Sequence, residues 1–500
     1  MKLNLKSTTP TQKIEPNVYG KEILRCFEED PTNMVIMGVP GCGKTTVLRM
    51  CANRIPRNKT AVLVCFNSAT AEHAKRVMPF NVHVSTTHTL GFNVIKSHYR
   101  NLMFKVNGRK VENYLKYQIL GEGKKKQLDS DKFHFLVTEG KEVIVPLMDF
   151  LRQTNSGLSL VQPIAEEFKL DFGEPHRQTV IELWQYLTQE PAKKYNTVDF
   201  ADMLWMPIYF EMTFPQYNYV LVDEYQDFNP AQIEMVKRLC AVGGKVVVVG
   251  DHNQSIYGWR GADTRAMQDA PSVFNAQVKP LSICYRCGEG IIQEAQKHIP
   301  NIEGTGKPGT VHEVTDLSLA REGDMVICRL VAPLIPEALK MFKLGKRVKI
   351  FDQDVSKWVL SYAKEVEKRH GTIDSQSIFQ YTETEITKAK QKRQLNKVNF
   401  LQDKRDILLG FVQESQFIEL KELKHYIEEL FINEEEEGIL FSTIHRVKGM
   451  EARNVFLLNP DLIPYKRAET EKEIEQEYNL LKVAITRAIE KLYYVRRTPE

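Results

Sequence analysis

Short apolar runs recur along the chain and predict buried strands. A first group comprises MVIMG at 34–38, AVLVCF at 61–66, VHVST at 82–86, YVLVDE at 219–224 and KVVVVGD at 245–251. A second group comprises MVICRL at 325–330, RVKIF at 347–351, GILFSTI at 438–444, NVFLL at 454–458 and KLYYV at 491–495. Most runs are continuously apolar rather than alternating, which is typical of parallel strands covered by helices on both faces. The pattern therefore predicts two doubly wound α/β domains with parallel sheets.

Two long stretches without such runs interrupt the pattern. Residues 91–198 lie between strands of the first group, have a helical pattern and carry basic clusters such as the lysines at 124–126. Residues 355–437 contain no proline and two glycines, which also favours helices. Their charge runs, KAKQKR and EEEE, are typical of solvated helix faces, with a DNA-facing surface as the alternative. The predicted domains are 1–90 with 199–280, a helical insertion at 91–198, 281–354 with 438–500, and a short helical insertion at 355–437.

Composition narrows the class of protein only modestly. The 500 residues are 42% hydrophobic and 26% charged, as expected of a globular protein with several cores. A net charge of +4 neither establishes nor excludes a nucleic-acid partner. The eight cysteines are scattered, which indicates reduced thiols, and the single CxxC at 284–287 lacks the second ligand pair of a zinc site. No signal peptide or membrane-length run is evident, so we predict a cytoplasmic protein with no membrane contact.

A phosphate-binding loop follows the first predicted strand. Residues 38–46 read GVPGCGKTT, a complete GxxxxGKT between an apolar strand and a helix-compatible segment. In such loops the backbone N–H groups surround the phosphates, the lysine reaches the β- and γ-phosphates, and the threonine hydroxyl ligates Mg²⁺. The residues expected at the nucleotide are Gly41, Cys42, Gly43, Lys44, Thr45 and Thr46.

Paired acids end the fourth strand of the first group. Asp223 lies at the tip of YVLVDE, where a carboxylate suits Mg²⁺ together with Thr45, and Glu224 is placed to orient and deprotonate an attacking water. Ligands of α/β sheets bind at such carboxyl ends of strands. The sequence therefore predicts a Mg²⁺-dependent nucleotide hydrolase that uses ATP.

Several motifs in order resemble the UvrD/Rep/PcrA group of superfamily 1 DNA helicases. They are DEYQD (223–227), VGDHNQSIYGWRGAD (249–263), CYR (284–286), STIHRVKGME (442–451) and VAITRA (483–488). The resemblance covers nearly the whole chain. It implies two RecA-like motor domains, ATP bound in the cleft between them, and translocation along single-stranded DNA in the 3′ to 5′ direction.

The resemblance also implies roles for individual nucleotide-binding residues. Gln254 would sense the γ-phosphate, and Arg286 and Arg487 would neutralise its developing charge, as a planar and permanently charged guanidinium does. Tyr285 would stack on the adenine. The remaining residues expected at the nucleotide are Gly449 and Glu451, of which Glu451 would bind the ribose hydroxyls.

A second set of residues is implied at single-stranded DNA. Aromatic rings stack on unpaired bases of any sequence, while polar and basic side chains hold phosphates and sugars. The residues expected at the nucleic acid are Phe66, Asn67, Thr87, His88, Tyr257, Trp259, Arg260, Thr443, His445 and Lys448.

Two departures from the family pattern limit what the resemblance predicts. Gly20 stands where a glutamine that reads adenine is expected, and Gln12 is the nearest candidate to replace it, so nucleotide selectivity stays open. The insertion at 355–437 is shorter than the regulatory subdomain of typical members. We therefore predict a monomeric ATP-dependent DNA helicase of repair or replication that acts on single strands and single-strand/duplex junctions. The alternatives are a DNA-dependent translocase that unwinds poorly or needs a protein partner, and an RNA helicase.

Overall fold

The computed structural model describes residues 15–115, 140–189, 196–391, 395–412, 417–431 and 437–496. They form two compact units. The first unit contains residues 16–38 and 44–281, and the second contains residues 39–43 and the chain from Ser282 onward. Gln12, the lysines at 124–126 and parts of both charge runs lie outside the described residues.

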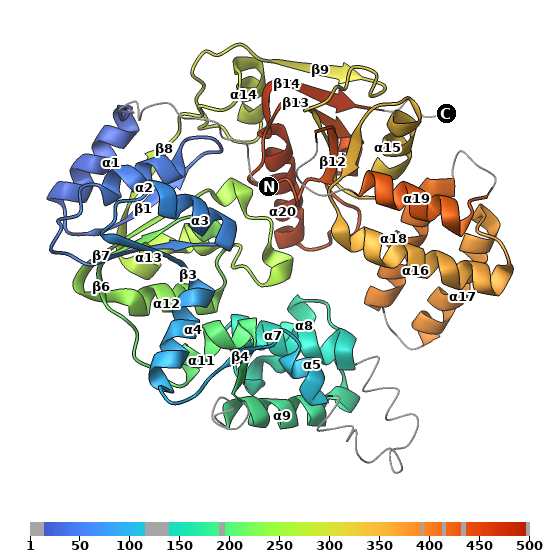
Figure 1. The fold of residues 1–500 in the computed structure, drawn as a ribbon. Coiled ribbons are helices and arrows are strands. Elements are labelled where there is room, and N and C mark those ends of the chain that lie inside the picture. Colours follow the sequence, from blue (N-terminus) through green and yellow to red (C-terminus); the bar gives the residue numbers. More distant parts are fainter. Residues whose placement is uncertain are drawn as a thin grey trace. The chain divides into compact units, whose positions relative to one another are not determined.

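The first unit is built on a six-stranded sheet in which every pairing is parallel, in the order β3-β2-β6-β7-β1-β8. Its strands are β1 (Asn33–Gly38), β2 (Ala61–Cys65), β3 (Val82–Thr86), β6 (Tyr217–Val222), β7 (Cys240–Gly250) and β8 (Ala276–Leu281). The helices around this sheet are α1 (Val18–Glu29), α2 (Lys44–Ala52), α3 (Ser68–Val77), α4 (Thr87–His98), α12 (Pro230–Leu239) and α13 (Ala266–Phe274) (Figure 1). β2 is wholly buried, and β6 and β7 are buried over their carboxyl-terminal halves, which explains the continuous apolar runs there.

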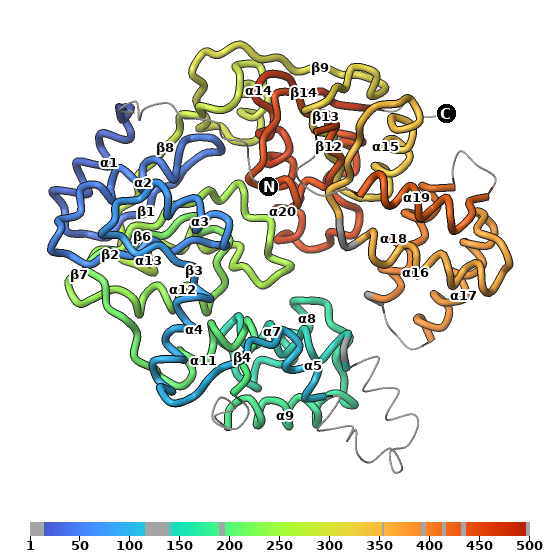
Figure 2. Tube along the Cα trace, viewed as in Figure 1, coloured from blue at the N-terminus to red at the C-terminus, as the bar shows by residue number. Residues whose placement is uncertain are grey.

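A helical segment is inserted between α4 and β6 of the first unit. It contains β4 (Lys105–Val106), α5 (Lys110–Tyr114), α7 (Val145–Gln153), α8 (Val161–Glu167), α9 (Glu174–Thr188), β5 (Thr197–Val198) and α11 (Phe200–Tyr209). Figure 2 shows these helices gathered beyond α4, on the side where α11 returns the chain to the sheet. Leu147, Leu183 and Trp205 of the insertion belong to the same buried cluster as Val62 and Val220 of the sheet. The insertion therefore shares the hydrophobic core of the first unit.

Buried charges also connect α5 and α7 of this insertion to the start of α11. Arg152 on α7 is fully buried and pairs with Asp199 at 2.7 Å and with Asp202 at 2.8 Å, while Lys110 pairs with Asp202 at 2.6 Å. Since removing one partner would leave an uncompensated buried charge, each such break costs about 3–5 kcal/mol. Burial raises the pKa of Asp199, and the charge of Arg152 opposes that rise.

The second unit repeats the plan with a six-stranded, all-parallel sheet in the order β11-β12-β10-β13-β14-β9. Its strands are β9 (Thr310–Val314), β10 (Met325–Cys328), β11 (Val348–Ile350), β12 (Ile439–Thr443), β13 (Ala452–Leu458) and β14 (Ala488–Val495). The helices around it are α14 (Glu289–Gln296), α15 (Leu334–Lys343) and α20 (Glu471–Ile485). The predicted fold class, two RecA-like parallel α/β domains with helical insertions, is confirmed.

Four helices form the insertion of the second unit. They are α16 (Gln353–His370), α17 (Ser375–Gln391), α18 (Leu395–Val412) and α19 (Leu420–Leu430), shown in orange in Figure 1. Val359, Leu408 and Leu423 of these helices share one buried cluster with Phe441 and Phe456 of the sheet. The helical prediction for this stretch is confirmed for the described residues, whereas the domain boundaries given above stay predictions.

The pattern missed one edge strand in each sheet. β8 contains Lys279 and Pro280. β9 reads TVHEV, and most of its side chains are exposed. Edge strands are covered on fewer sides and tolerate proline because one row of N–H groups faces away from the ladder. They consequently lack the continuous apolar run by which the central strands were identified.

None of the helices in the described part of the chain has the length and apolar character needed to cross a membrane.

Candidate functional site

The carboxyl edge of the first sheet brings the predicted residues of this unit together. The loop before Lys44 follows β1, Asp223 and Glu224 follow β6, and Gln254 follows β7. Because all strands run parallel, their carboxyl ends share one edge. In the strand order, β6, β7 and β1 are consecutive, so the residues predicted to bind the nucleotide are neighbours in space as well.

The phosphate loop and the acidic pair are in direct contact. The Thr45 hydroxyl donates to Asp223 at 2.9 Å, and the Lys44 ammonium lies 3.7 Å from the Glu224 carboxylate. Asp223 is buried, and burial together with the charge of Glu224 raises its pKa, against the opposing influence of Lys44. A hydroxyl beside a buried carboxylate is a set of hard oxygen donors that fits Mg²⁺, which takes the remaining ligands from water and phosphate.

Glu224 has a backbone conformation that few residues adopt. Its φ of 51° and ψ of 44° are left-handed, in a residue that is not glycine. Such strain persists where the surrounding structure determines it, and it concentrates at functional sites. Here it turns the Glu224 side chain toward Lys44 and Gln226. The conformation thus serves to aim a carboxylate that the extended strand would direct elsewhere.

A chain of hydrogen bonds connects Glu224 to Gln254. The Gln226 amide donates to Glu224 at 2.6 Å, the Asp251 N–H donates to the Gln226 oxygen at 3.0 Å, and the Gln254 amide donates to Asp251 at 2.7 Å. Gln226, Asp251 and Gln254 are buried. Sequence reasoning assigned no role to Gln226 or Asp251, although both lie within the recognised motifs. Their position inside DEYQD (223–227) and VGDHNQSIYGWRGAD (249–263) was the available signal.

Gly250 makes room for this hydrogen-bonded chain. A Cβ atom at Gly250 would lie 2.6 Å from the Gln226 oxygen and 2.4 Å from the Met267 sulfur. Any side chain at this position would therefore displace Gln226.

Aromatic and basic side chains gather beside β2 and β7. Phe66 follows β2 and stacks on Tyr257, with ring centroids 6.2 Å apart and an interplanar angle of 9°. The Arg260 guanidinium lies 4.5 Å from the Trp259 ring centroid and 5.4 Å from that of Tyr257. Trp259 is 55% exposed. An exposed tryptophan held by an arginine presents a ring face of the kind on which unpaired bases stack.

Residues after β3 extend this surface. His88 contacts Phe200 edge to face, with centroids 6.1 Å apart, and burial lowers the pKa of His88. Phe200 is 58% exposed and was missed by sequence reasoning, because a single aromatic after a predicted helix boundary carries no distinctive signal. Thr87 is fully buried, and its hydroxyl accepts from Gln232 at 2.8 Å, which gives it a role in the fold.

Asn67 has a local structural role as well, since its side chain accepts from the Thr70 N–H at 2.8 Å and caps α3.

In the second unit, a different group of predicted residues lies around Gly41 of the phosphate loop. The Tyr285 N–H donates to the Gly41 carbonyl at 2.9 Å. Gly41 has a φ of 69°, and a Cβ there would lie 2.8 Å from Arg286 Cβ, so both backbone conformation and space require glycine. Arg286 pairs with Glu451 at 2.5 Å and donates to the Thr486 carbonyl at 3.2 Å.

Arg487 lies next to this group and is buried. Its guanidinium donates to the carbonyls of Val483 and Met450, both at 3.0 Å, and to the Thr486 hydroxyl at 3.3 Å. Arg487 immediately precedes β14, and Glu451 immediately precedes β13. Both residues therefore lie at the amino edge of the second sheet.

The remaining predicted residues of this unit lie between β12 and β13. Thr443 ends β12 and His445 follows it, both partly exposed, at the carboxyl edge of the sheet. Lys448 is partly exposed, and Gly449 has a φ of 88° within the turn that leads to Glu451. Gly20, the residue in place of an expected glutamine, is buried in the first turn of α1, where its N–H donates to Asn17 at 2.7 Å.

No group of three or more His, Cys, Asp or Glu side chains suited to a metal ion occurs among the residues that the structure describes. All eight cysteines are free thiols, including Cys284 and Cys287. A Mg²⁺ site with Thr45 and Asp223 needs only one carboxylate, since phosphate oxygens complete it.

Comparisons with known proteins agree with these motifs. F-box DNA helicase protein 1 of Schizosaccharomyces pombe is 24% identical over 96% of this chain and 58% of its own length. ATP-dependent DNA helicase Rep of Salmonella typhimurium is 30% identical over 44% of this chain and 32% of its own length, and DNA helicase II of the same organism is 36% identical over 27% and 20%. The chain thus spans between one fifth and three fifths of the length of these relatives.

A solved arterivirus helicase bound to DNA aligns with 95% of this chain and 63% of its own, at 12% identity and a TM-score of 0.34, a likeness too weak to support a conclusion. Two family profiles match the sequence more directly. The profile described as the UvrD/REP helicase N-terminal domain matches residues 21–275, and that of the UvrD-like helicase C-terminal domain matches residues 438–495. With half of its length matched by the first profile alone, this chain belongs to the UvrD/Rep helicase family.

Proposed function

We propose that this chain is an ATP-dependent DNA helicase that moves along single-stranded DNA in the 3′ to 5′ direction and unwinds duplexes at single-strand/duplex junctions. The observation that carries the proposal is the hydrogen-bonded chain from Glu224 through Gln226 and Asp251 to Gln254. Only three residues after Gln254 the same connection reaches Tyr257, and then Trp259 and its neighbours. Residues suited to the nucleotide and residues suited to unpaired bases are thereby joined by a short, largely buried segment.

The hydrolytic step follows from the chemistry of the first unit. Lys44 and the N–H groups of the phosphate loop bind the phosphates, and Glu224 orients and deprotonates the attacking water. Thr45 and Asp223 would hold Mg²⁺, which would neutralise part of the phosphate charge. Gln226 keeps the Glu224 carboxylate in position, and Gln254 registers whether the γ-phosphate is present. Arg286 and Arg487 supply permanent positive charge for the transferring phosphoryl group.

Coupling to DNA follows from the same connection. A shift of Gln254 on loss of the γ-phosphate is transmitted to Tyr257 and Trp259, and a base stacked on these rings biases Gln254 in return, since coupling between two binding sites is reciprocal.

Two assays test the proposal. ATP hydrolysis is measured with and without single-stranded DNA, and strong stimulation is expected. Unwinding is then measured on duplexes with a 3′ or a 5′ tail, and we expect only the 3′-tailed substrate to be opened. Hydrolysis that ignores DNA contradicts the motor, and opening of the 5′-tailed substrate alone contradicts the polarity. Equal or greater stimulation by RNA of the same sequence would favour an RNA helicase.

A second candidate is a translocase that hydrolyses ATP on single-stranded DNA but opens duplexes poorly or only with a protein partner. The small size of the second insertion is the observation that favours it, because the helices α16–α19 are the whole of this insertion within the described residues. Strong DNA-stimulated hydrolysis without unwinding of either tailed duplex identifies this candidate.

A further inference from the structure

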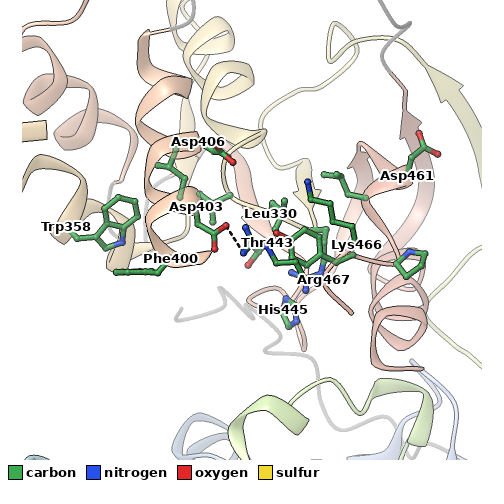
Figure 3. Close-up of a pocket in the computed structure, with 17 residues that line it drawn as sticks. Leu330, Trp358, Phe400, Asp403, Asp406, Thr443, His445, Asp461, Lys466 and Arg467 are labelled. Carbon is green, nitrogen blue, oxygen red and sulfur yellow. Dashed lines mark ion pairs between the residues drawn. The ribbon is translucent and has the colours of Figure 1, made fainter. Parts of the chain in front are cut away.

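A cavity of about 510 Å³ lies where the second insertion meets the carboxyl edge of the second sheet. Trp358 on α16 and Phe400 on α18 line it from the insertion, and Thr443 and His445 line it from the end of β12 (Figure 3). Its volume falls within the roughly 300–1,000 Å³ of ligand pockets. Thr443 and His445, two of the predicted DNA contacts, therefore line the same cavity as Trp358 and Phe400. The sequence motifs gave no role to these two aromatic residues.

The wall from the insertion is aromatic. The rings of Trp358 and Phe400 are 6.3 Å apart at 61°, and Phe400 is 51% exposed. The Lys404 ammonium lies 4.3 Å from the Phe400 centroid and 5.3 Å from that of Trp358. Burial lowers the pKa of Lys404. This lysine holds the two rings in place from one side and leaves Phe400 open to the cavity, where a planar apolar ligand can stack.

Charged side chains of both signs also line the cavity, Asp403 from α18 of the insertion and Lys466 and Arg467 from the loop after β13. Arg467 pairs with Asp403 of α18 at 3.3 Å and donates to Gln402 at 3.0 Å, which connects the loop after β13 to the insertion. Lys466, the preceding residue, is exposed, and no ionic partner of its side chain occurs in the described ranges. Burial raises the pKa of Asp403, and the charge of Arg467 opposes this.

These groups together match the chemistry of a nucleotide. A base needs an aromatic face to stack on, its ring N–H or amino donor needs an acceptor, and its phosphate needs a cation. Phe400, Asp403 and Lys466 supply one of each around the same cavity. A purely apolar ligand would leave Lys466 without a function, and a free phosphate would meet the repulsion of the Asp403 carboxylate.

We propose that this cavity binds one nucleotide of the single-stranded DNA that runs past Thr443 and His445, with its base on Phe400 and its phosphate on Lys466. The second insertion then acts as a clamp on the strand. This inference rests on the proposed function, because it requires that the chain bind single-stranded DNA.

Phe400→Ala in the full chain tests the stacking. Binding of fluorescein-labelled oligothymidylate is followed by fluorescence anisotropy, and Kd is expected to rise about tenfold, as for loss of one stacked base. Phe400→Tyr, which keeps the ring, is expected to bind like the unmodified chain. The matched control is Phe379→Ala, since Phe379 is a 44% exposed aromatic of α17 in the same insertion that does not line the cavity.

Lys466→Ala tests the phosphate contact with a measurement that a merely structural role would not change. The slope of log Kd against the logarithm of the salt concentration is expected to fall by about one, as for loss of one phosphate contact. Lys364→Ala, an exposed lysine of α16, is the control and is expected to keep the slope.

The outcomes separate this inference from the proposed function. Trp259→Ala in the first unit reports on DNA binding independently of the cavity. If Trp259→Ala weakens binding while Phe400→Ala and Lys466→Ala match their controls, the cavity is not a DNA site. If the unmodified chain binds no oligothymidylate, both proposals are overturned. If free dTMP displaces the labelled strand from the unmodified chain but not from Phe400→Ala, the ligand of the cavity is a free nucleotide. If oligouridylate binds more tightly than oligothymidylate and this binding depends on Phe400, the ligand is RNA.

Discussion

In the first sheet, the residues predicted to bind the nucleotide and those predicted to bind DNA all follow the carboxyl ends of strands. In the second sheet the two sets lie at opposite ends. Thr443 and His445 end β12, whereas Glu451 and Arg487 precede β13 and β14. Strands of seven and eight residues separate the two edges by roughly 20 Å.

The comparison shows two ways in which a parallel sheet can connect two ligands. The first sheet does so through adjacent side chains, because Gln226 and Asp251 bridge Glu224 and Gln254 by hydrogen bonds. The second sheet has no room for such contacts between its edges, and the segment from Thr443 to Glu451 crosses from one edge to the other instead. Substitutions in the first sheet should therefore change hydrolysis and DNA response together, and those in the second should change them separately.

The largest effect is expected at the amino edge of the second sheet. Arg487→Lys keeps a positive charge but loses the planar fork, and ATP turnover should fall by about 10³-fold. Affinity for single-stranded DNA should stay within twofold of the unmodified chain, as measured by anisotropy. Because Arg487 is buried, a thermal melt accompanies the assay. A variant that melts normally but also loses DNA affinity would show that the two edges of this sheet do not act separately on ATP and DNA.

Glu224→Gln in the first sheet is expected to lower turnover by roughly 10²-fold or more, since the amide cannot accept the proton of the attacking water. Nucleotide binding, measured with a fluorescent ATP analogue, should persist. Lys44→Ala is the contrasting variant, because it should weaken nucleotide binding as well. Glu234→Gln, on the outer surface of α12, is the matched control and should hydrolyse ATP normally. Normal turnover in Glu224→Gln would show that Glu224 is not the general base that deprotonates the attacking water.

Gln226→Leu tests the hydrogen-bonded chain itself. Loss of a buried partner at Glu224 and Asp251 costs about 1–3 kcal/mol, so DNA-stimulated turnover should fall roughly tenfold, by more than the basal rate falls. The ratio of stimulated to basal hydrolysis is the measurement. Gly250→Ala should lower the same ratio, because its methyl group would displace Gln226. An unchanged ratio in both variants would show that the first sheet does not couple its ligands through these side chains.

The smallest effect is expected at the carboxyl edge of the second sheet. His445→Ala should weaken single-stranded DNA binding by about 2- to 12-fold, as for one hydrogen bond of about 0.5–1.5 kcal/mol, with basal hydrolysis unchanged. Anisotropy and basal ATPase assays on one preparation make the comparison. A loss of basal hydrolysis would mean that the two edges of this sheet are not independent.

The sequence by itself determined the central strands, the order of the motifs and the set of residues predicted to form the site. Fully buried strands such as β2 must be continuously apolar, and a phosphate loop needs its glycines and lysine at fixed spacing, so both leave a local trace. The edge strands β8 and β9 have no continuous apolar run, because many of their side chains are exposed and need not be apolar.

Only the tertiary structure decided which residues meet. The contact of Gln226 with Asp251, the buried position of Thr87, and the approach of Phe400 to Thr443 and His445 join positions far apart along the chain or in unmarked sequence. Such contacts depend on strand order and helix packing, which no local spacing encodes. The chemistry of each side chain is written in the sequence, whereas its partners are fixed by the long-range packing of the sheets.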